Sequence, residues 1–243
     1  MKVTTANWTF YLQTKEDKRY MLPLFCFVRN QFVEIFGEEV LNSEECEVFN
    51  APAASCPMLI TNTVPIRIRT SVPSLQIWNQ YIYQLSHEMT HYVIRQYKPD
   101  KRVIIKWFEE TLCEAMSLYI LKRAKEHWNL CTLSALNADY GAKMLDYCKN
   151  VYQKTSDSVL KQCHNLSDLE TIENTCEENR DARSLERNYL FDTFCEYPDC
   201  ISAFVYYPLY MCGNLQIDFT KWKENDACPL IPKLENIQPV LFS

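Results

Sequence analysis

The sequence contains very little glycine, with only three glycines in 243 residues. This scarcity excludes collagen-like and glycine-linker proteins, and an apolar content of 47% excludes a disordered chain. A chain of this length can bury a sizeable core, either as one large domain or as two closely packed subdomains. The plentiful aromatic residues, 13% of the chain, are typical of a helix-rich globular protein.

The chain also lacks an excess of basic residues. It has 25 lysines and arginines against 31 aspartates and glutamates, which gives a net charge of −6. Proteins that bind nucleic acids usually carry a basic stripe that neutralises phosphates. We therefore expect no nucleic-acid partner.

Long apolar runs are missing as well. The longest nearly pure apolar run is Leu22–Val28, whereas a helix needs about 20 apolar residues to cross a membrane. The first twenty residues show no apolar core followed by a small-residue cleavage site, so we expect no secretory signal. The sequence therefore predicts a cytoplasmic protein without a membrane partner.

Cysteine, in contrast, is abundant, with twelve residues in the chain. Their even number permits disulfides, but they are scattered singly along a chain that is long enough to form a core without them. We therefore expect mostly reduced, buried thiols. Cys195 and Cys200 are close in sequence, but a lone pair at this spacing is weak evidence for a metal site or a disulfide.

The first third of the chain predicts mixed α and β structure. Residues 3–13 are rich in β-branched and aromatic residues and predict a strand, and 18–36 has the apolar spacing of an amphipathic helix. Strand-like sequence follows at 58–63. Residues 65–69 alternate, with isoleucines on one face and arginines on the other, as in a half-buried strand.

From residue 73 onward the apolar period becomes helical. Four helices are predicted, at 74–97, 107–128, 137–154 and 167–196. Strands followed by helices predict an α+β fold with a mixed N-terminal sheet, a backing helix and a mainly helical C-terminal half. We expect one domain over 1–243, made of an α+β subdomain (about 1–97) and a mainly helical subdomain (about 98–243).

The segment His87-Glu88-Met89-Thr90-His91 lies within the predicted helix 74–97. Residues four apart lie on one helical face, so His87 and His91 can direct two imidazoles at a single metal ion. Glu88 is offset by about 100°, which suits a general base for the attacking water and not a ligand. A surface helix that happens to carry two histidines is the ordinary explanation of so short a motif.

A catalytic zinc site needs three protein ligands and one open position, so a third ligand must exist. The metzincin pattern is excluded, because Ile94 and Tyr97 occupy the positions where that class has glycine and histidine. The next predicted helix offers three carboxylates: Glu109, Glu110 and Glu114. Adjacent residues on a helix point about 100° apart, so only one of Glu109 and Glu110 can face the histidines.

Eighteen residues separate His91 from Glu110. This HExxH-x18-E spacing resembles the gluzincin metallopeptidases, the clan of the M1 aminopeptidases. The stretch Trp107-Phe108-Glu109-Glu110 resembles the family's tryptophan–apolar–Asn–Glu sequence, although Glu109 replaces the asparagine. The resemblance spans about residues 75–119 and implies a zincin-like fold, with Glu110 as the third zinc ligand. There is no Gly-x-Met-Glu-Asn segment upstream, so aminopeptidase activity is not implied.

The resemblance also implies roles for residues outside the ligand set. Gluzincins often carry an acidic residue that accepts the ring N–H of a zinc-bound histidine, and Glu114 is the candidate here. A downstream tyrosine or histidine usually stabilises the oxyanion. Fifteen tyrosines do not single one out; Tyr189 is one candidate, with core packing as its other explanation.

The sequence therefore predicts a zinc-dependent hydrolase that acts on peptide or protein substrates. One zinc ion per chain is expected to bind His87, His91 and Glu110, with Glu88 as the catalytic base. The alternatives are a catalytically silent zincin-like binding or regulatory protein and a purely structural helical protein. The intact Glu88 favours the enzyme, because a silent site has no chemical need for a base.

Overall fold

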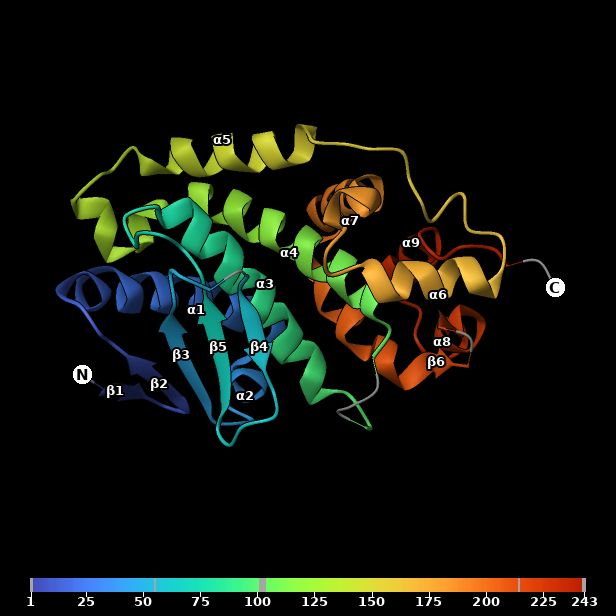
Figure 1. Ribbon diagram of the computed structural model, residues 1–243, viewed down its shortest axis with the longest axis horizontal. Coiled ribbons are helices and arrows are strands. Elements are labelled where there is room, and N and C mark those ends of the chain that lie inside the picture. Colours follow the sequence, from blue (N-terminus) through green and yellow to red (C-terminus); the bar gives the residue numbers. More distant parts are fainter. Residues whose placement is uncertain (1, 55, 101–103, 214, 242–243) are drawn as a thin grey trace. The chain divides into compact units, whose positions relative to one another are not determined.

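The computed structural model describes residues 2–54, 56–100, 104–213 and 215–241. The chain has an α+β fold with a mixed five-stranded sheet and many helices (Figure 1). It divides into two compact units. The first comprises Met1–Val93 and Ser117–Asn150, and the second comprises Ile94–Met116 and Val151–Ser243.

The sheet belongs to the first unit, in the strand order β1-β2-β3-β5-β4. Its strands are β1 (Lys2–Thr5), β2 (Trp8–Tyr11), β3 (Cys46–Asn50), β4 (Met58–Ile60) and β5 (Ile66–Thr70). The β2–β3 and β3–β5 pairs are parallel, whereas β1–β2 and β4–β5 are antiparallel. The sheet is therefore mixed, as the sequence predicts.

The single strand predicted over residues 3–13 is wrong, because a hairpin turn divides it into β1 and β2. Ala6 adopts a left-handed backbone with φ of 48° at this turn. Alanine pays a steric penalty there that glycine would avoid, so the sequence carries no turn signal. The alternation predicted for residues 65–69 is confirmed by β5, where Ile66 and Ile68 are buried and Arg67 and Arg69 are half-buried.

Helices cover the sheet through an aromatic core. Helix α1 (Leu22–Phe36) follows a π-helical turn at Asp17–Met21, and the short α2 (Glu38–Leu41) comes next. The Trp8 ring on β2 lies 5.0 Å from Phe25 of α1 and 4.9 Å from Tyr92 of α3 (Trp78–Gln96). Tyr92 also donates a hydrogen bond to the carbonyl of Glu44, at 2.9 Å. These contacts hold α3, the helix that carries the HExxH segment, against the sheet.

Three helices agree with the predicted ranges. They are α3, α4 (Lys106–Glu126) and α5 (Tyr140–Gln153). The boundaries of the two compact units fall inside α3, between Val93 and Ile94, and inside α4, between Met116 and Ser117. Both helices are continuous across these boundaries.

The second unit contains mainly helices. They are α6 (Leu166–Thr175), α7 (Ser184–Glu196), α8 (Phe219–Asn225) and α9 (Leu230–Glu235), with a 3₁₀ segment at Pro198–Tyr210 and a small hairpin of β6 (Met211–Cys212) and β7 (Gln216–Ile217). The continuous helix predicted over 167–196 is wrong, because the chain leaves helical geometry between α6 and α7. There the buried Arg183 donates to the carbonyl of Cys176, at 2.8 Å, which stabilises the break.

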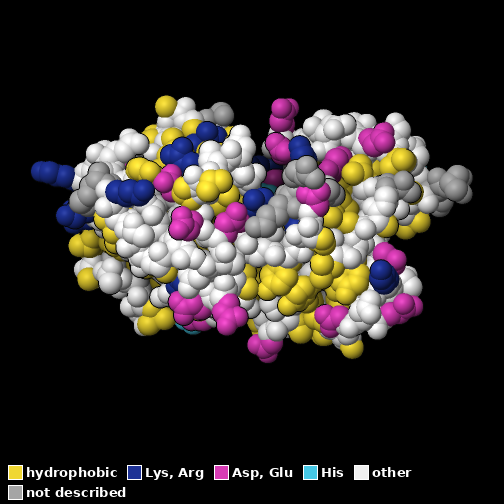
Figure 2. Space-filling view, turned by 90° about the horizontal axis from the view of Figure 1, so that it is seen from below, with side chains coloured by type: hydrophobic (Ala, Val, Ile, Leu, Met, Phe, Trp, Pro, Cys, Tyr) yellow, Lys and Arg dark blue, Asp and Glu magenta, His cyan; other side chains and the backbone are white. Residues whose placement is uncertain are grey.

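All twelve cysteines are free thiols, in agreement with the expectation of reduced cysteines. Six of the twelve are buried. Within the ranges that the structure describes, no helix is both long and apolar enough to span a membrane. On the face shown in Figure 2, lysine and arginine side chains are interspersed with acidic ones.

Candidate metal centre

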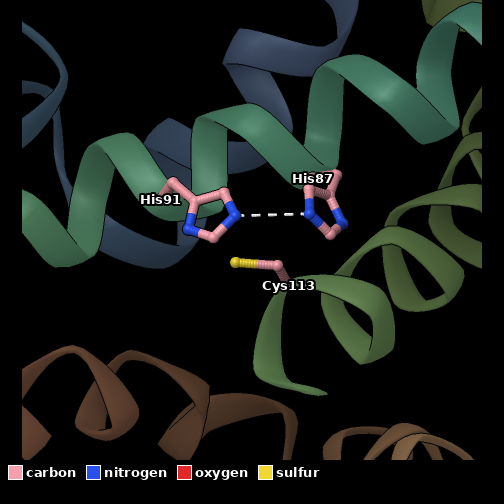
Figure 3. Close-up of side chains that lie close together, drawn as sticks. All are labelled: His87, His91 and Cys113. Carbon is pink, nitrogen blue, oxygen red and sulfur yellow. Dashed lines mark hydrogen bonds between the residues drawn. The ribbon is translucent and has the colours of Figure 1, made fainter. Parts of the chain in front are cut away.

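The two histidines of the HExxH segment lie one turn apart near the middle of α3. Their Nε2 atoms are 3.2 Å from each other, and their ring centroids are 5.0 Å apart (Figure 3). His87 is buried and His91 is half-buried. The helix thus directs both imidazoles at one point, as the spacing of four residues predicts.

The separation of these nitrogens suits a zinc ion. Two imidazole nitrogens bound to one tetrahedral zinc, each about 2.0–2.1 Å from the metal, lie about 3.3 Å apart. The observed distance of 3.2 Å is close to that value. Without a metal, the same contact requires an N–H on one ring and a lone pair on the other. A bound metal needs the lone pairs of both Nε2 atoms, so each neutral ring would then carry its proton on Nδ1.

A third donor close to these nitrogens comes from α4. The sulfur of Cys113 and one ring nitrogen from each histidine all lie within 4.8 Å of one another (Figure 3). Cys113 is fully buried, and it stands four residues before Ser117, where the continuous α4 enters the first unit. His87, His91 and Cys113 therefore form a largely buried group that could bind a metal ion.

The sequence did not identify Cys113 as a ligand. The available signal was its spacing, since Glu110, Cys113 and Glu114 recur three and four residues apart on one face of α4. Among the described residues, the group of close donors contains Cys113 and not Glu110. Glu110 is mostly buried one turn before Cys113, and its role as the third zinc ligand stays a prediction.

Glu88 directly follows His87 in α3 and is also buried, with 3% of its surface exposed. Its side chain leaves the helix about 100° from that of His87, so the two point in different directions. This geometry separates the predicted base from the predicted ligands. The catalytic role of Glu88 remains a prediction.

Glu109 has two contacts within the second unit. Its carboxylate forms a buried ion pair with Lys98, at 2.8 Å, and accepts a hydrogen bond from the Tyr207 hydroxyl. Burial, followed by the negative charge of Glu109, raises the pKa of Tyr207 well above its usual value. Both contacts are made to one oxygen, Oε2, and the expectation that Glu109 is not a ligand stays a prediction.

Glu114 and Arg183 face each other in a fully buried pair. The Arg183 Nη2 atom lies 3.4 Å from Oε1 of Glu114, and the same guanidinium donates to Thr111 and to the carbonyl of Cys176. Burial raises the pKa of Glu114 to about 7, while the charge of Arg183 opposes this rise. The second oxygen, Oε2, has no hydrogen-bond partner among the described residues and can accept a hydrogen bond from a further donor. The predicted contact from Glu114 to a histidine stays a prediction.

Tyr189 lies on α7, and its hydroxyl accepts a hydrogen bond from the side-chain amide of Asn236, at 2.8 Å. It lines a pocket of about 450 Å³ whose walls, which include Glu186, Ile237 and Val240, all belong to the second unit. This contact gives Tyr189 a local structural role. Its role as oxyanion stabiliser stays a prediction.

Comparison of the chain with protein-family models, with curated proteins and with solved structures gives no match. The functional argument therefore depends on the donor group and on the sequence motif that carries it.

Proposed function

We propose that this protein is a zinc-dependent hydrolase, a gluzincin-like metallopeptidase that cleaves peptide or protein substrates. The observation that carries the proposal is the HExxH helix, which brings the Nε2 atoms of His87 and His91 to 3.2 Å. The buried donor face of α4 supports it, because that face offers the further ligand that a catalytic zinc requires.

Each residue of the site then has a defined task. His87 and His91 bind the metal as neutral imidazoles, and Glu110 is the proposed third ligand. When bound, zinc polarises the scissile carbonyl and lowers the pKa of water. Glu88 takes the proton from the attacking water and passes it to the leaving amine. Burial of Glu88 keeps this carboxylate out of bulk solvent.

The alternative is a catalytically silent zincin-like protein that uses the same group for binding or regulation. The close His87/His91/Cys113 group is compatible with it, since a purely structural metal site needs only ligands. Glu88 distinguishes the two functions, because only the hydrolase needs a base.

The test combines metal analysis with peptide cleavage. Purified protein should contain about one zinc ion per chain by elemental analysis, as a single site requires. Cleavage of a peptide library, followed by mass spectrometry, should show products with the wild type. Glu88→Gln should keep its zinc and lose activity by about 100-fold or more, because it lacks the general base.

A matched control is Glu126→Gln, which makes the same chemical change at an exposed position of α4. It should keep both zinc and activity. A protein that takes up no zinc even when zinc is added would end the metalloenzyme proposal. An active Glu88→Gln variant would instead disprove the mechanism, whatever its metal content.

A further inference from the structure

Helices α3 and α4 together offer four metal donors. Helix α3 carries His87 and His91 four residues apart, and α4 carries Glu110 and Cys113 three residues apart. Two ligands three residues apart on one helix can bind the same metal site, as the Glu-x-x-His pairs of di-iron helix bundles do. The proposed ligand Glu110 therefore does not exclude Cys113 from the same shell.

The number of protein ligands determines what a zinc site can do. Structural zinc sites are closed by four protein ligands, whereas catalytic sites keep one position open for water. The Cys113 sulfur lies within 4.8 Å of one ring nitrogen from each histidine. Thiolate is a strong ligand for zinc. A ligand set of two histidines, Glu110 and Cys113 would fill all four positions.

We propose that Cys113 is a fourth protein ligand of the metal and closes the site in the resting enzyme. This inference rests on the proposed function, which supplies the zinc ion and Glu110. Hydrolysis then starts only after ligand exchange. Release of Cys113 would leave its thiolate to take a proton from solvent, and the fourth position would then be open to the attacking water. The protein would thus hold its catalytic centre in a latent form.

Cobalt spectroscopy tests the ligand without depending on activity. The metal-free protein is loaded with Co²⁺, and a thiolate ligand adds a sulfur-to-cobalt charge-transfer band in the near ultraviolet. The wild type should show this band, and Cys113→Ser should bind cobalt without it. Cys148→Ser is the matched control and should keep the band. Cys148 is buried like Cys113, but its sulfur lies 3.7 Å from the carbonyl of Leu118, and it does not belong to the donor group.

Peptide cleavage tests the closure itself. If the open form makes up at most a tenth of the resting enzyme, Cys113→Ala should raise kcat/KM about tenfold or more. Cys113→Ser serves as a second variant in case the alanine variant folds poorly, and thermal unfolding of both verifies the fold. An unchanged or lower kcat/KM in folded variants would overturn the closure.

The outcomes separate this inference from the proposed function. Cobalt bound by the wild type without a thiolate band overturns Cys113 as a ligand and leaves the proposed hydrolase standing. A wild type that binds neither zinc nor cobalt overturns both. If the wild type shows the thiolate band but neither it nor the Cys113 variants cleave peptides, Cys113 remains a metal ligand. The proposed hydrolase is then disproved, and the latent site with it.

Discussion

The directions of Glu109 and Glu110 on helix α4 show how adjacent, identical residues acquire different contacts. Glu109 points to a side where Lys98 and Tyr207 bind its carboxylate, in a buried network within the second unit. Glu110 leaves the helix about 100° away, and Cys113, four residues after Glu109 and three after Glu110, lies between these two directions and joins the two histidines. All four residues are buried, so burial alone does not identify the donor face. The partners do.

The largest expected effect comes from removing the network on the Glu109 side. Glu109→Ala leaves the ammonium of Lys98 buried without its counter-charge, which should reduce the free energy of unfolding by about 3–5 kcal/mol. Denaturant titration measures this loss. Glu109→Gln keeps a hydrogen-bond acceptor and should lose less. Zinc affinity of the folded Glu109→Ala protein should stay unchanged, and a selective loss of zinc would show that Glu109 is the ligand.

Removal of Glu110 should affect the metal more than the fold. Glu110→Ala leaves one carboxylate ligand fewer, so zinc affinity should fall by more than about 100-fold, beyond the usual effect of an outer-shell residue. Competition with a chelator of known affinity measures the change. If Glu110→Ala retains zinc while Glu109→Ala loses it, then Glu109 is the ligand and the eighteen-residue spacing from His91 to Glu110 is the wrong register.

A smaller effect is expected at Glu114. If its carboxylate orients a metal-binding histidine, Glu114→Ala should weaken zinc binding by about 10- to 100-fold without abolishing the site. The same chelator competition ranks it against Glu110→Ala. Glu114→Gln, which can still accept a hydrogen bond, should recover part of the affinity. Equal losses in Glu114→Ala and Glu110→Ala would remove the distinction between ligand and outer-shell residue.

The smallest effect is expected away from α4, at Tyr189. Tyr189→Phe removes the acceptor for the Asn236 amide and should reduce stability by about 1 kcal/mol, the usual worth of one hydrogen bond. Thermal or denaturant unfolding measures this. Peptide cleavage should be unchanged. A loss of kcat by about 100-fold would instead assign Tyr189 to the oxyanion, as expected for removal of one such donor.

The elements with a strong period were predictable from the sequence. Helices α3, α4 and α5 follow long apolar repeats, and the alternation of β5 matches its burial. The hairpin turn at Ala6 and the break between α6 and α7 were not predictable. The turn contains Ala6, a residue type without turn preference. The break depends on Arg183, which contacts residues distant in sequence such as Thr111.

The same division applies to the candidate site. The helical spacing of His87 and His91 predicts their convergence, because both lie on one element with a known period. Cys113 was missed because its proximity depends on how α3 and α4 pack and on side-chain rotamers, neither of which the spacing determines. Arg183, the partner of Glu114, was missed for the same reason.

The continuity of α3 and α4 across the unit boundaries has a consequence for cooperativity. The chain leaves the first unit after Val93, returns at Ser117 and leaves it again after Asn150. Since helical hydrogen bonds join residues four apart, the bonds that cross the first two boundaries belong to both units at once. A truncation after Asn150 would keep the whole first unit, yet it would strip Glu109 of Tyr207. Local opening of either unit at these boundaries would therefore break hydrogen bonds within the two helices that carry the donors.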